Sequence, residues 1–426
     1  MTLLKFPRNI LHWGRCTSRS YSSHSLVDRI KIRVLFTILV LLTSIIIISS
    51  PSKADVRNPN QPWLDVDSKG NAVICWERGG WQIWFCKLDN NGNYIVGKTL
   101  VNPGLADTPS KPKVVVDAED NIHIFYLGYT SERGTGEINI HYYKFDKQGK
   151  PLIKNKILGM TGYKTIWDTA DIYNVLLAHS GRLQLVYYTK ENNSWGVRYV
   201  NLDKAGNALV NEFLPSFFGL GGAGTVGISF SMDSDSQDNI HFVWSEGYIV
   251  LNTTTLNHTE RQSFYAGDVI KVDSHDDIHI LTLNRGTYLK LNDNGTLVKQ
   301  GTISDLLHIM GYPLIVDDNE YLCLDKHSVA DSTGKLHMVS VTSELVEDGQ
   351  DHRYDNTIYY TNVDIATGKV LIDDMVIDSD NLNQKIALEL VVAVIGIVLL
   401  ISIITIIALK SRRKKQSANR NRKEVG

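Results

Sequence analysis

Four histidines occupy the same place in a repeated pattern of this sequence. Each lies in an apolar, strand-like run after a polar turn, and the four are His123, His241, His279 and His337. Imidazole binds metals and transfers protons near neutral pH, so rings converging on one axis would form a metal or catalytic centre. Repetition at one position is also what a structural role predicts. We therefore favour the interpretation in which each imidazole packs within its own repeat and hydrogen-bonds a neighbouring turn.

An acidic string offers the oxygen ligands that calcium prefers. Asp233, Asp235 and Asp238 lie close together in the sequence, but the string lacks the glycine and the distal glutamate of an EF-hand loop. The alternative is a solvated turn between two strands. The sequence thus suggests Ca²⁺ as a ligand here without firmly implying any cofactor, and Cys and His do not occur at zinc-ligand spacing.

Tryptophans are numerous in the middle of the chain, and an exposed indole can stack on a sugar ring. Trp81, beside two glycines at the tip of a predicted hairpin, is the strongest candidate for such a ligand site, and Trp167 and Trp195 are further candidates. Trp76 and Trp244 lie within the strand repeat and are expected in the core. Core packing is the alternative for the whole group.

Two cysteines fall on successive strands of one predicted hairpin. A disulfide between Cys75 and Cys86 forms only if the strand register places them face to face, and the alternative is a pair of buried free thiols. Asn-x-Ser/Thr sequons, which are candidate glycosylation sites on an external surface, occur at Asn192, Asn252, Asn257 and Asn294.

These residues must be positioned by a repeated unit that dominates the middle of the chain. The unit is an apolar strand, an Asp-centred turn, a second strand often reading Asn-Ile-His, and a third strand ending in Leu-Asp-x-x-Gly. Asp, Asn and Gly in such turns accept left-handed backbone and cap amide groups, and the alternation in Ile-His-Ile-Phe-Tyr is typical of a half-buried strand. The copies begin at Asp67, Asp117, Ala178, Asp235, Asp273 and Asp331.

The spacing of the copies, 38 to 61 residues, suits four-stranded propeller blades of about 40–50 residues with insertions. Six copies predict an all-β fold, a β-propeller with six blades. The segment 313–325 also reads as a turn followed by a strand, so a longer sixth blade or a partial seventh blade is an alternative. A propeller buries each sheet between its neighbours, so that no blade has to be stable alone.

The repeat, Asp-x-x-x-Asn-Ile-His-x-x-Trp followed by Ile-Tyr-Tyr-x-x-Leu-Asp-x-x-Gly, resembles those of sialidase-like (BNR-type) β-propeller proteins of prokaryotic, particularly archaeal, cell surfaces. The resemblance covers roughly residues 60–380 and implies the propeller fold. The strict Asp-box is only approximated, by Asp67-Ser68-Lys69-Gly70 before Trp76, and no Arg-Ile-Pro sequence occurs. These departures argue against sialidase activity.

Two apolar segments flank the repeats. Residues 386–409 carry one charge and precede a basic tail, 410–426. This segment is long enough to cross about 30 Å of hydrocarbon as a helix, and the basic tail is expected to stay in the cytoplasm. Residues 34–50 are uncharged and follow a basic stretch, which predicts a signal peptide cleaved before Asp55 or an uncleaved signal anchor. Either outcome places residues 55–383 outside the cell, on a chain that spans the cell membrane once or twice.

Charge narrows the range of partners. Residues 34–409 carry 29 Lys/Arg and 44 Asp/Glu, and this acidity argues against nucleic acid as a partner. We expect a leader with its signal or anchor helix (1–54), an extracytoplasmic propeller (55–383), a transmembrane helix (386–409) and a cytoplasmic tail (410–426). The expected partners are the lipid bilayer and a surface glycan or protein.

The function that fits best is a surface module that binds a glycan, an envelope component or a protein. One alternative is a sialidase-like glycoside hydrolase or lyase, which requires an Arg or a carboxylate pair converging from different blades in an axial pocket. Another is a purely structural envelope protein.

Overall fold

The computed structural model describes residues 59–79, 82–102, 108–129, 138–161, 172–215, 230–259, 262–282, 285–302, 307–309, 312–317, 320–323, 327–348 and 351–379. The chain divides into two compact units, Asp55–Asn383 and a second made of Met1–Ala54 and Gln384–Gly426. All described residues belong to the first unit. The apolar segments 34–50 and 386–409 and the basic tail lie outside them, and no helix within the described ranges has the length and apolarity needed to cross a membrane.

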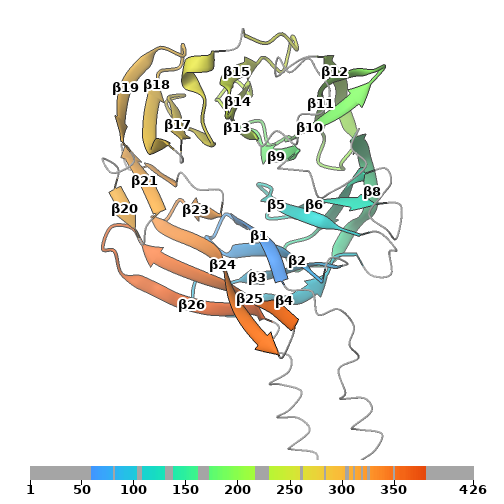
Figure 1. Ribbon diagram of the computed structural model, residues 1–426, viewed down its shortest axis with the longest axis vertical. Helices are drawn as coiled ribbons and strands as arrows, with labels where there is room; N and C mark the ends of the chain where they lie inside the picture. Colours follow the sequence, from blue (N-terminus) through green and yellow to red (C-terminus); the bar gives the residue numbers. More distant parts are fainter. Residues whose placement is uncertain are drawn as a thin grey trace, which may run out of the picture. The chain divides into compact units, whose positions relative to one another are not determined.

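The described residues form seven antiparallel sheets that follow one another around a ring (Figure 1). Within each sheet the strands pair in sequence order. Six sheets carry the predicted repeat, and we number them as blades 1 to 6 in chain order. The blades comprise β1 (Pro59–Val66), β2 (Ala72–Arg78), β3 (Gln82–Leu88) and β4 (Tyr94–Leu100); β5 (Ser110–Val116), β6 (Ile122–Tyr129), β7 (Ile138–Phe145) and β8 (Pro151–Thr161); β9 (Tyr173–Leu177), β10 (Leu183–Glu191), β11 (Ser194–Leu202) and β12 (Ala208–Pro215); β13 (Phe230–Ser234), β14 (Ile240–Trp244) and β15 (Gly247–Leu251); β16 (Val269–Val272), β17 (Ile278–Thr282), β18 (Thr287–Leu291) and β19 (Leu297–Thr302); and β23 (Ser328–Ala330), β24 (Lys335–Asp348), β25 (Asp351–Asp364) and β26 (Val370–Ser379).

The prediction of an all-β propeller is confirmed, with six blades that carry the repeat. The seventh sheet consists of β20 (Leu307–Ile309), β21 (Tyr312–Asp317) and β22 (Glu320–Cys323). It occupies the segment for which the sequence left open a partial seventh blade. Blade 4 has three strands among the described residues, followed by the 3-10 helix η1 (Ser263–Tyr265). It is the copy in which no clear Leu-Asp-x-x-Gly follows the third strand.

An aspartate builds the turn between the first two strands of a blade. In blade 1, Oδ1 of Asp67 accepts the backbone N–H of Lys69 at 2.8 Å and of Asn71 at 2.9 Å. The fourth turn residue takes left-handed backbone, with φ of +73° at Gly70 and +64° at Asp238 in blade 4. Gly and Asp tolerate this conformation better than most residues, which explains why these residue types mark the repeat.

The hydrophobic core lies between the blades. One cluster joins β2 and β3 of blade 1 to β5–β7 of blade 2, another joins blade 1 to blade 6, and a large cluster runs through blades 2, 3 and 4. A further cluster joins blades 4 and 5, so blades 1 to 4 are each covered on both faces by their neighbours. This arrangement provides burial that a single four-stranded sheet could not supply by itself.

The strand register excludes the disulfide considered for Cys75 and Cys86. Cys75 pairs with Phe85 and Cys86 with Ile74, so the two side chains point to opposite faces of the sheet. Cys75 packs in the core shared with blade 2 and Cys86 in the core shared with blade 6. Both are buried free thiols, and burial raises the pKa of both.

Asp378, at the end of the last blade, closes the ring. Its buried carboxylate accepts Trp76 Nε1–H at 2.8 Å, Lys98 Nζ at 3.1 Å and Arg78 at 3.4 Å, all from blade 1. The first and last blades are thus joined by charge-assisted hydrogen bonds as well as by apolar packing. We call this contact between blades 1 and 6 the seam.

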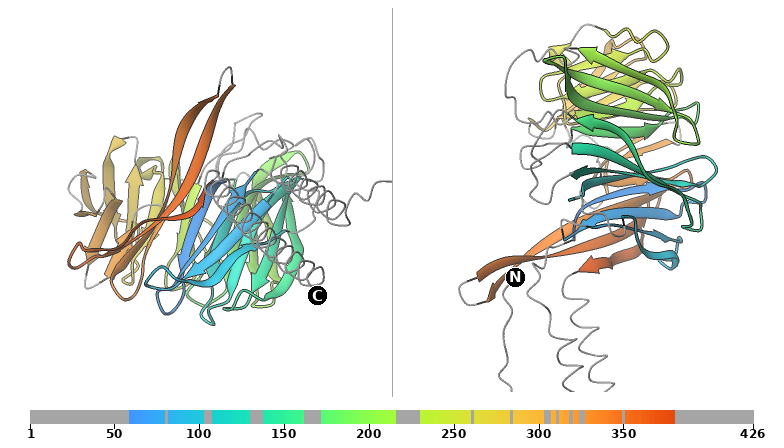
Figure 2. Two further views of the ribbon diagram at one scale, coloured as in Figure 1. Left: turned by 90° about the horizontal axis from the view of Figure 1, so that it is seen from below. Right: turned by 90° about the vertical axis from the view of Figure 1, so that its right-hand side faces the viewer.

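The hairpin of β24 and β25 extends beyond the rest of its blade (Figure 2). The two strands pair from Lys335–Asp364 to Asp348–Asp351, whereas β26 pairs with β25 only between Thr357 and Val363. The distal part of this hairpin is therefore a two-stranded arm.

Candidate functional site

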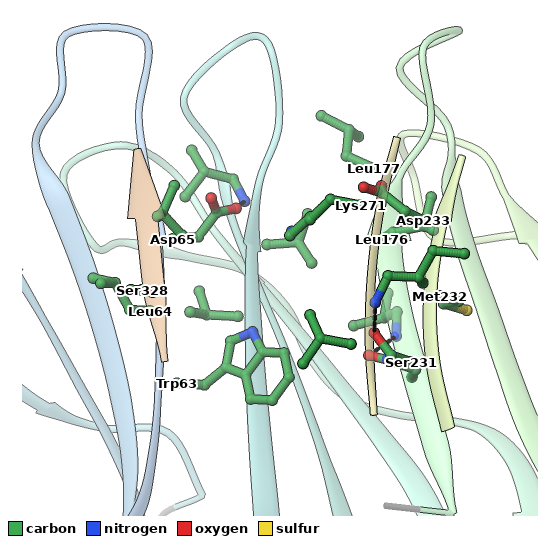
Figure 3. Close-up of a pocket in the computed structure, with 18 residues that line it drawn as sticks. Trp63, Leu64, Asp65, Leu176, Leu177, Ser231, Met232, Asp233, Lys271 and Ser328 are labelled. Carbon is green, nitrogen blue, oxygen red and sulfur yellow. Dashed lines mark hydrogen bonds between the residues drawn. The ribbon is translucent and has the colours of Figure 1, made fainter. Parts of the chain in front are cut away.

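The first strands of the six blades surround a cavity of about 310 Å³. Most of its lining residues are aliphatic, although polar atoms make up more of the lining surface, and the charged residues that line it are Asp65 of β1, Asp233 of β13 and Lys271 of β16. Each lies two residues before the first residue of its turn, so equivalent strands place the three at one level. Figure 3 shows this level above that of Trp63 and Ser231.

The two cavity carboxylates each bind the edge of the following blade. Oδ1 of Asp65 accepts the N–H of Val66 at 2.8 Å, and Oδ2 accepts that of Val116 in β5 at 2.7 Å. Asp233 bonds its own following residue in the same way, and its Oδ2 accepts the N–H of Val272 in β16 at 3.0 Å. First strands have no sheet partner on their inner edge, so these carboxylates satisfy amide groups that would otherwise face the cavity.

The cavity is lined by more acidic than basic side chains. Burial raises the pKa of Asp65 to about 6, which hydrogen bonds from Val116 and Val66 and the positive charge of Lys271 only partly offset. Lys271 projects into the space from a strand that is not adjacent to β1 (Figure 3). At neutral pH the residues lining the cavity carry two carboxylates and one ammonium group.

Trp63 is the aromatic residue of the cavity wall. The Nζ atom of Lys113, a residue that is 2 % exposed, lies 4.3 Å from the centroid of the indole ring and donates to Oδ1 of Asn174 at 3.1 Å. The ring of His327 meets the indole edge to face, with centroids 6.3 Å apart. These neighbours hold the indole in one orientation through a cation–π contact and an aromatic contact.

The four repeat histidines lie inside their blades, as the structural interpretation predicted. In blade 5, His279 Nε2–H donates to Oδ2 of Asp273 at 2.9 Å, and the hydroxyl of Tyr288 donates to Nδ1 at 2.9 Å. Burial lowers the pKa of His279, although Asp273 opposes this effect, so the ring is neutral. The same Asp–His–Tyr chain joins Asp117, His123 and Tyr142; Asp235, His241 and Tyr248; and Asp331, His337 and Tyr360.

Two blades replace this chain in different ways. In blade 1 a valine stands at the histidine position, and Lys87 Nζ instead forms an ion pair with Asp67 at 2.7 Å. In blade 3 both partners change together, to Ala178 and Gln184. The histidine therefore occurs only with its aspartate, because a buried imidazole without its acceptor would be destabilising, whereas the aspartate can be kept with another partner, as in blade 1.

The structure gives the three candidate calcium ligands different partners. Asp233 binds the edge of blade 5, as described above. Asp235 caps its own turn and accepts His241 Nε2–H at 3.3 Å, whereas Asp238 Oδ1 accepts the N–H of Ser180 in blade 3 at 3.0 Å. Among the described residues, no group of three or more His, Cys, Asp or Glu side chains is arranged to hold a metal ion.

Of the tryptophans predicted to bind ligand, the structure describes only Trp195, since Trp81 and Trp167 lie outside the described residues. Trp195 is half-buried on β11, stacks on Tyr188 with ring centroids 5.1 Å apart, and does not line the axial cavity. Trp76 and Trp244 are fully buried, which confirms the core role expected for them.

The four sequons differ in the accessibility of their amide groups. Asn192, Asn257 and Asn294 are exposed. Asn252 is half-buried, its Nδ2 donates to Asn239 at 3.0 Å, and its Oδ1 accepts the N–H of Thr255 at 2.8 Å. Glycan attachment at Asn252 would have to break the bond to Asn239.

Sequence reasoning missed Trp63, Asp65 and Lys271 as site residues. Their common signal is position, because Asp65 and Lys271 stand two residues before a repeat turn and Trp63 stands four before it. Once the first strands are known to face the axis, residues at these positions can be identified as candidates for the cavity wall.

No protein-family model and no curated protein sequence matches this chain. Among solved structures, virginiamycin B lyase from Staphylococcus aureus is 11% identical over 70% of this chain and 91% of its own, with a TM-score of 0.38. An α-L-arabinofuranosidase from Fusarium graminearum is 9% identical over 68% and 89% of the two chains, with a TM-score of 0.42. A family 117 glycoside hydrolase from Zobellia galactanivorans is 11% identical over 74% and 87%, with a TM-score of 0.35. At these values the similarity carries no information on activity.

Proposed function

We propose that this protein is a membrane-anchored β-propeller of the cell surface that binds a small polar ligand, such as the terminal residue of a glycan, in its axial cavity. The observation that carries the proposal is the convergence of charged side chains from three blades and one fixed indole on a cavity of about 310 Å³. Ligand sites are typically concave and mainly apolar, with a few polar groups that fix orientation, and this volume is at the small end of their range.

The membrane anchor and the surface location rest on the sequence. The apolar segment 386–409 is followed at once by basic residues, an order that retains the tail in the cytoplasm and exports what precedes it. Extraction of the protein from membranes and its accessibility to protease added outside intact cells measure these two points.

The binding proposal is tested by screening the full-length chain, purified in mild detergent, against a glycan array. A Trp63→Leu variant removes the indole from the cavity, and Trp195→Leu removes an indole from a hairpin outside it. We expect Trp63→Leu to abolish binding and Trp195→Leu to preserve it, with circular dichroism confirming that both variants fold. Binding lost only in Trp195→Leu would move the site to that hairpin, and no binding to any glycan would reject the proposal.

A second candidate function, cleavage of a glycosidic bond by hydrolysis or by a lyase reaction, is favoured by one observation. Two carboxylates from different blades line the cavity, and the raised pKa of Asp65 suits a proton donor near neutral pH. Assay of chromogenic glycosides and uronate-containing polysaccharides tests this function. Turnover that disappears in both Asp65→Asn and Asp233→Asn would support it, whereas an unchanged rate in either variant would exclude the paired mechanism.

A further inference from the structure

We infer that the ligand group held in the axial cavity is an amine, so that an amino sugar or another ammonium-bearing residue is preferred over a neutral sugar or a uronate. This inference rests on the proposed function and adds the chemical class of the ligand. It is carried by the two carboxylates and single ammonium group that line the cavity.

The charges at the level of Asp65, Asp233 and Lys271 do not balance. A single ammonium group cannot neutralise two carboxylates, so this level keeps one net negative charge at neutral pH. Another cation near the cavity, Lys113, lies against the indole of Trp63 and donates to Asn174. The cavity is enclosed by the first strands of six blades, with Leu176 and Met232 among the lining residues. Charges inside a protein cavity are screened less than charges in bulk water, so one unbalanced charge favours a cationic ligand over a neutral or anionic one.

Both carboxylates keep acceptor sites for further hydrogen bonds. Each oxygen of Asp65 and Asp233 accepts one backbone N–H, whereas a carboxylate has about four acceptor sites in total. Both groups line the cavity. They can therefore accept further hydrogen bonds from a ligand ammonium group without giving up those that hold the blades together.

Lys271 is the cation that opposes the two carboxylates in the cavity. Lys271 extends into the cavity, and its charge acts on Asp65 from a non-adjacent blade. Its positive charge attracts the same carboxylates and repels a ligand ammonium group that approaches them. Removing its charge should therefore strengthen the binding of an amine and should change the binding of a neutral ligand little.

The experiment measures the affinity of the full-length chain in detergent for D-glucosamine, D-glucose and D-glucuronate by titration calorimetry at pH 7. We expect glucosamine to bind most tightly and glucuronate least. Lys271→Met should strengthen glucosamine binding on the order of tenfold and leave glucose within about twofold of the wild-type affinity. Lys299→Met, an exposed change on the outer strand β19, alters the net charge equally and should have no effect.

The outcomes separate the inference from the proposed function. If glucose or glucuronate binds at least as tightly as glucosamine, or if Lys271→Met weakens glucosamine binding, the cavity binds sugars but does not select amines. If none of the three sugars binds while the glycan array shows cavity-dependent binding, the amine preference is rejected and the binding function remains. Failure of both experiments removes the function as well.

Discussion

Replacing Asp273 by alanine tests whether the Asp–His–Tyr chain stabilises its blade. The Asp273 side chain, 1% exposed, accepts three hydrogen bonds, from the N–H groups of His275 and Asp277 at 2.9 and 2.8 Å and from His279 Nε2–H at 2.9 Å. Loss of the two turn bonds costs about 1–2 kcal/mol, as for other side-chain caps. The imidazole of His279, which is 0% exposed, then has no acceptor, which costs about 1–3 kcal/mol more. The expected total is about 4 kcal/mol.

Blade 3 supplies the matched control. There, Ala178 and Gln184 stand where blade 5 has Asp273 and His279. The double variant Asp273→Ala/His279→Gln reproduces this natural pair and removes the buried imidazole. It should recover about 1–2 kcal/mol relative to Asp273→Ala alone, so the two substitutions should be non-additive.

Amide hydrogen exchange of the full-length chain measures the effect within one blade, because local opening is reported peptide by peptide. A loss of about 4 kcal/mol corresponds to roughly thousandfold faster exchange in β16 and β17, and the double variant should slow that exchange about tenfold. Peptides from blade 2 serve as an internal reference. A double variant no better protected than Asp273→Ala would refute the proposed dependence of the histidine on its acceptor.

Three other predictions follow from the packing and the buried groups. Asp378→Asn should weaken the seam and lower the thermal unfolding temperature by several degrees, as a loss of about 1–2 kcal/mol implies, while Asp373→Asn, exposed on the same strand, should leave it unchanged. Cys75 and Cys86 should react with a thiol reagent only after denaturation, since both are buried and burial raises the pKa of both; labelling in the native state would contradict their packing. Stability should decrease as the pH falls below about 6.5, because the unfolded chain then protonates histidines while His123 and His279, whose pKa burial lowers, stay neutral. Asp65, whose pKa is raised to about 6, acts in the opposite direction but is a single group against two. Urea midpoints that rise on acidification between pH 7 and 5.5 would contradict this assignment.

The repeat could be predicted from the sequence because its physical causes are local. A turn aspartate caps amides two and four residues later, as Asp67 does, and this requirement leaves the same spacing in most blades. The structural role of the histidines was predictable for the same reason, since a group that serves its own blade recurs with the blade. Where the aspartate is absent, at Ala178, the histidine is absent too.

The cavity could not be predicted, because its chemistry lies at a position that does not repeat. The residues two places before the turns are Asp65, Val115, Leu176, Asp233, Lys271 and Val329. Nothing in that series marks a site until the first strands are placed around an axis. Closeness in the sequence was also a poor guide to a calcium site. Asp233, Asp235 and Asp238 lie close together in the chain, yet each carboxylate bonds a different partner in the structure.

Strand register was the remaining unknown. The hairpin that contains Cys75 and Cys86 was foreseen, yet a one-residue offset decides whether two side chains share a face. Here the offset places the thiols in separate cores. A pattern of alternating residues specifies that two strands pair, but the loop between them sets which residues are opposite.

The seam has a mechanical consequence. Asp378 lies one residue before the end of β26. A pulling force applied to the chain beyond β26 therefore acts on the hydrogen bonds of Asp378 before it acts on any other blade. The strand that receives the load also carries the carboxylate that fastens the first blade to the last, so the ring is reinforced at the point where a tether would pull.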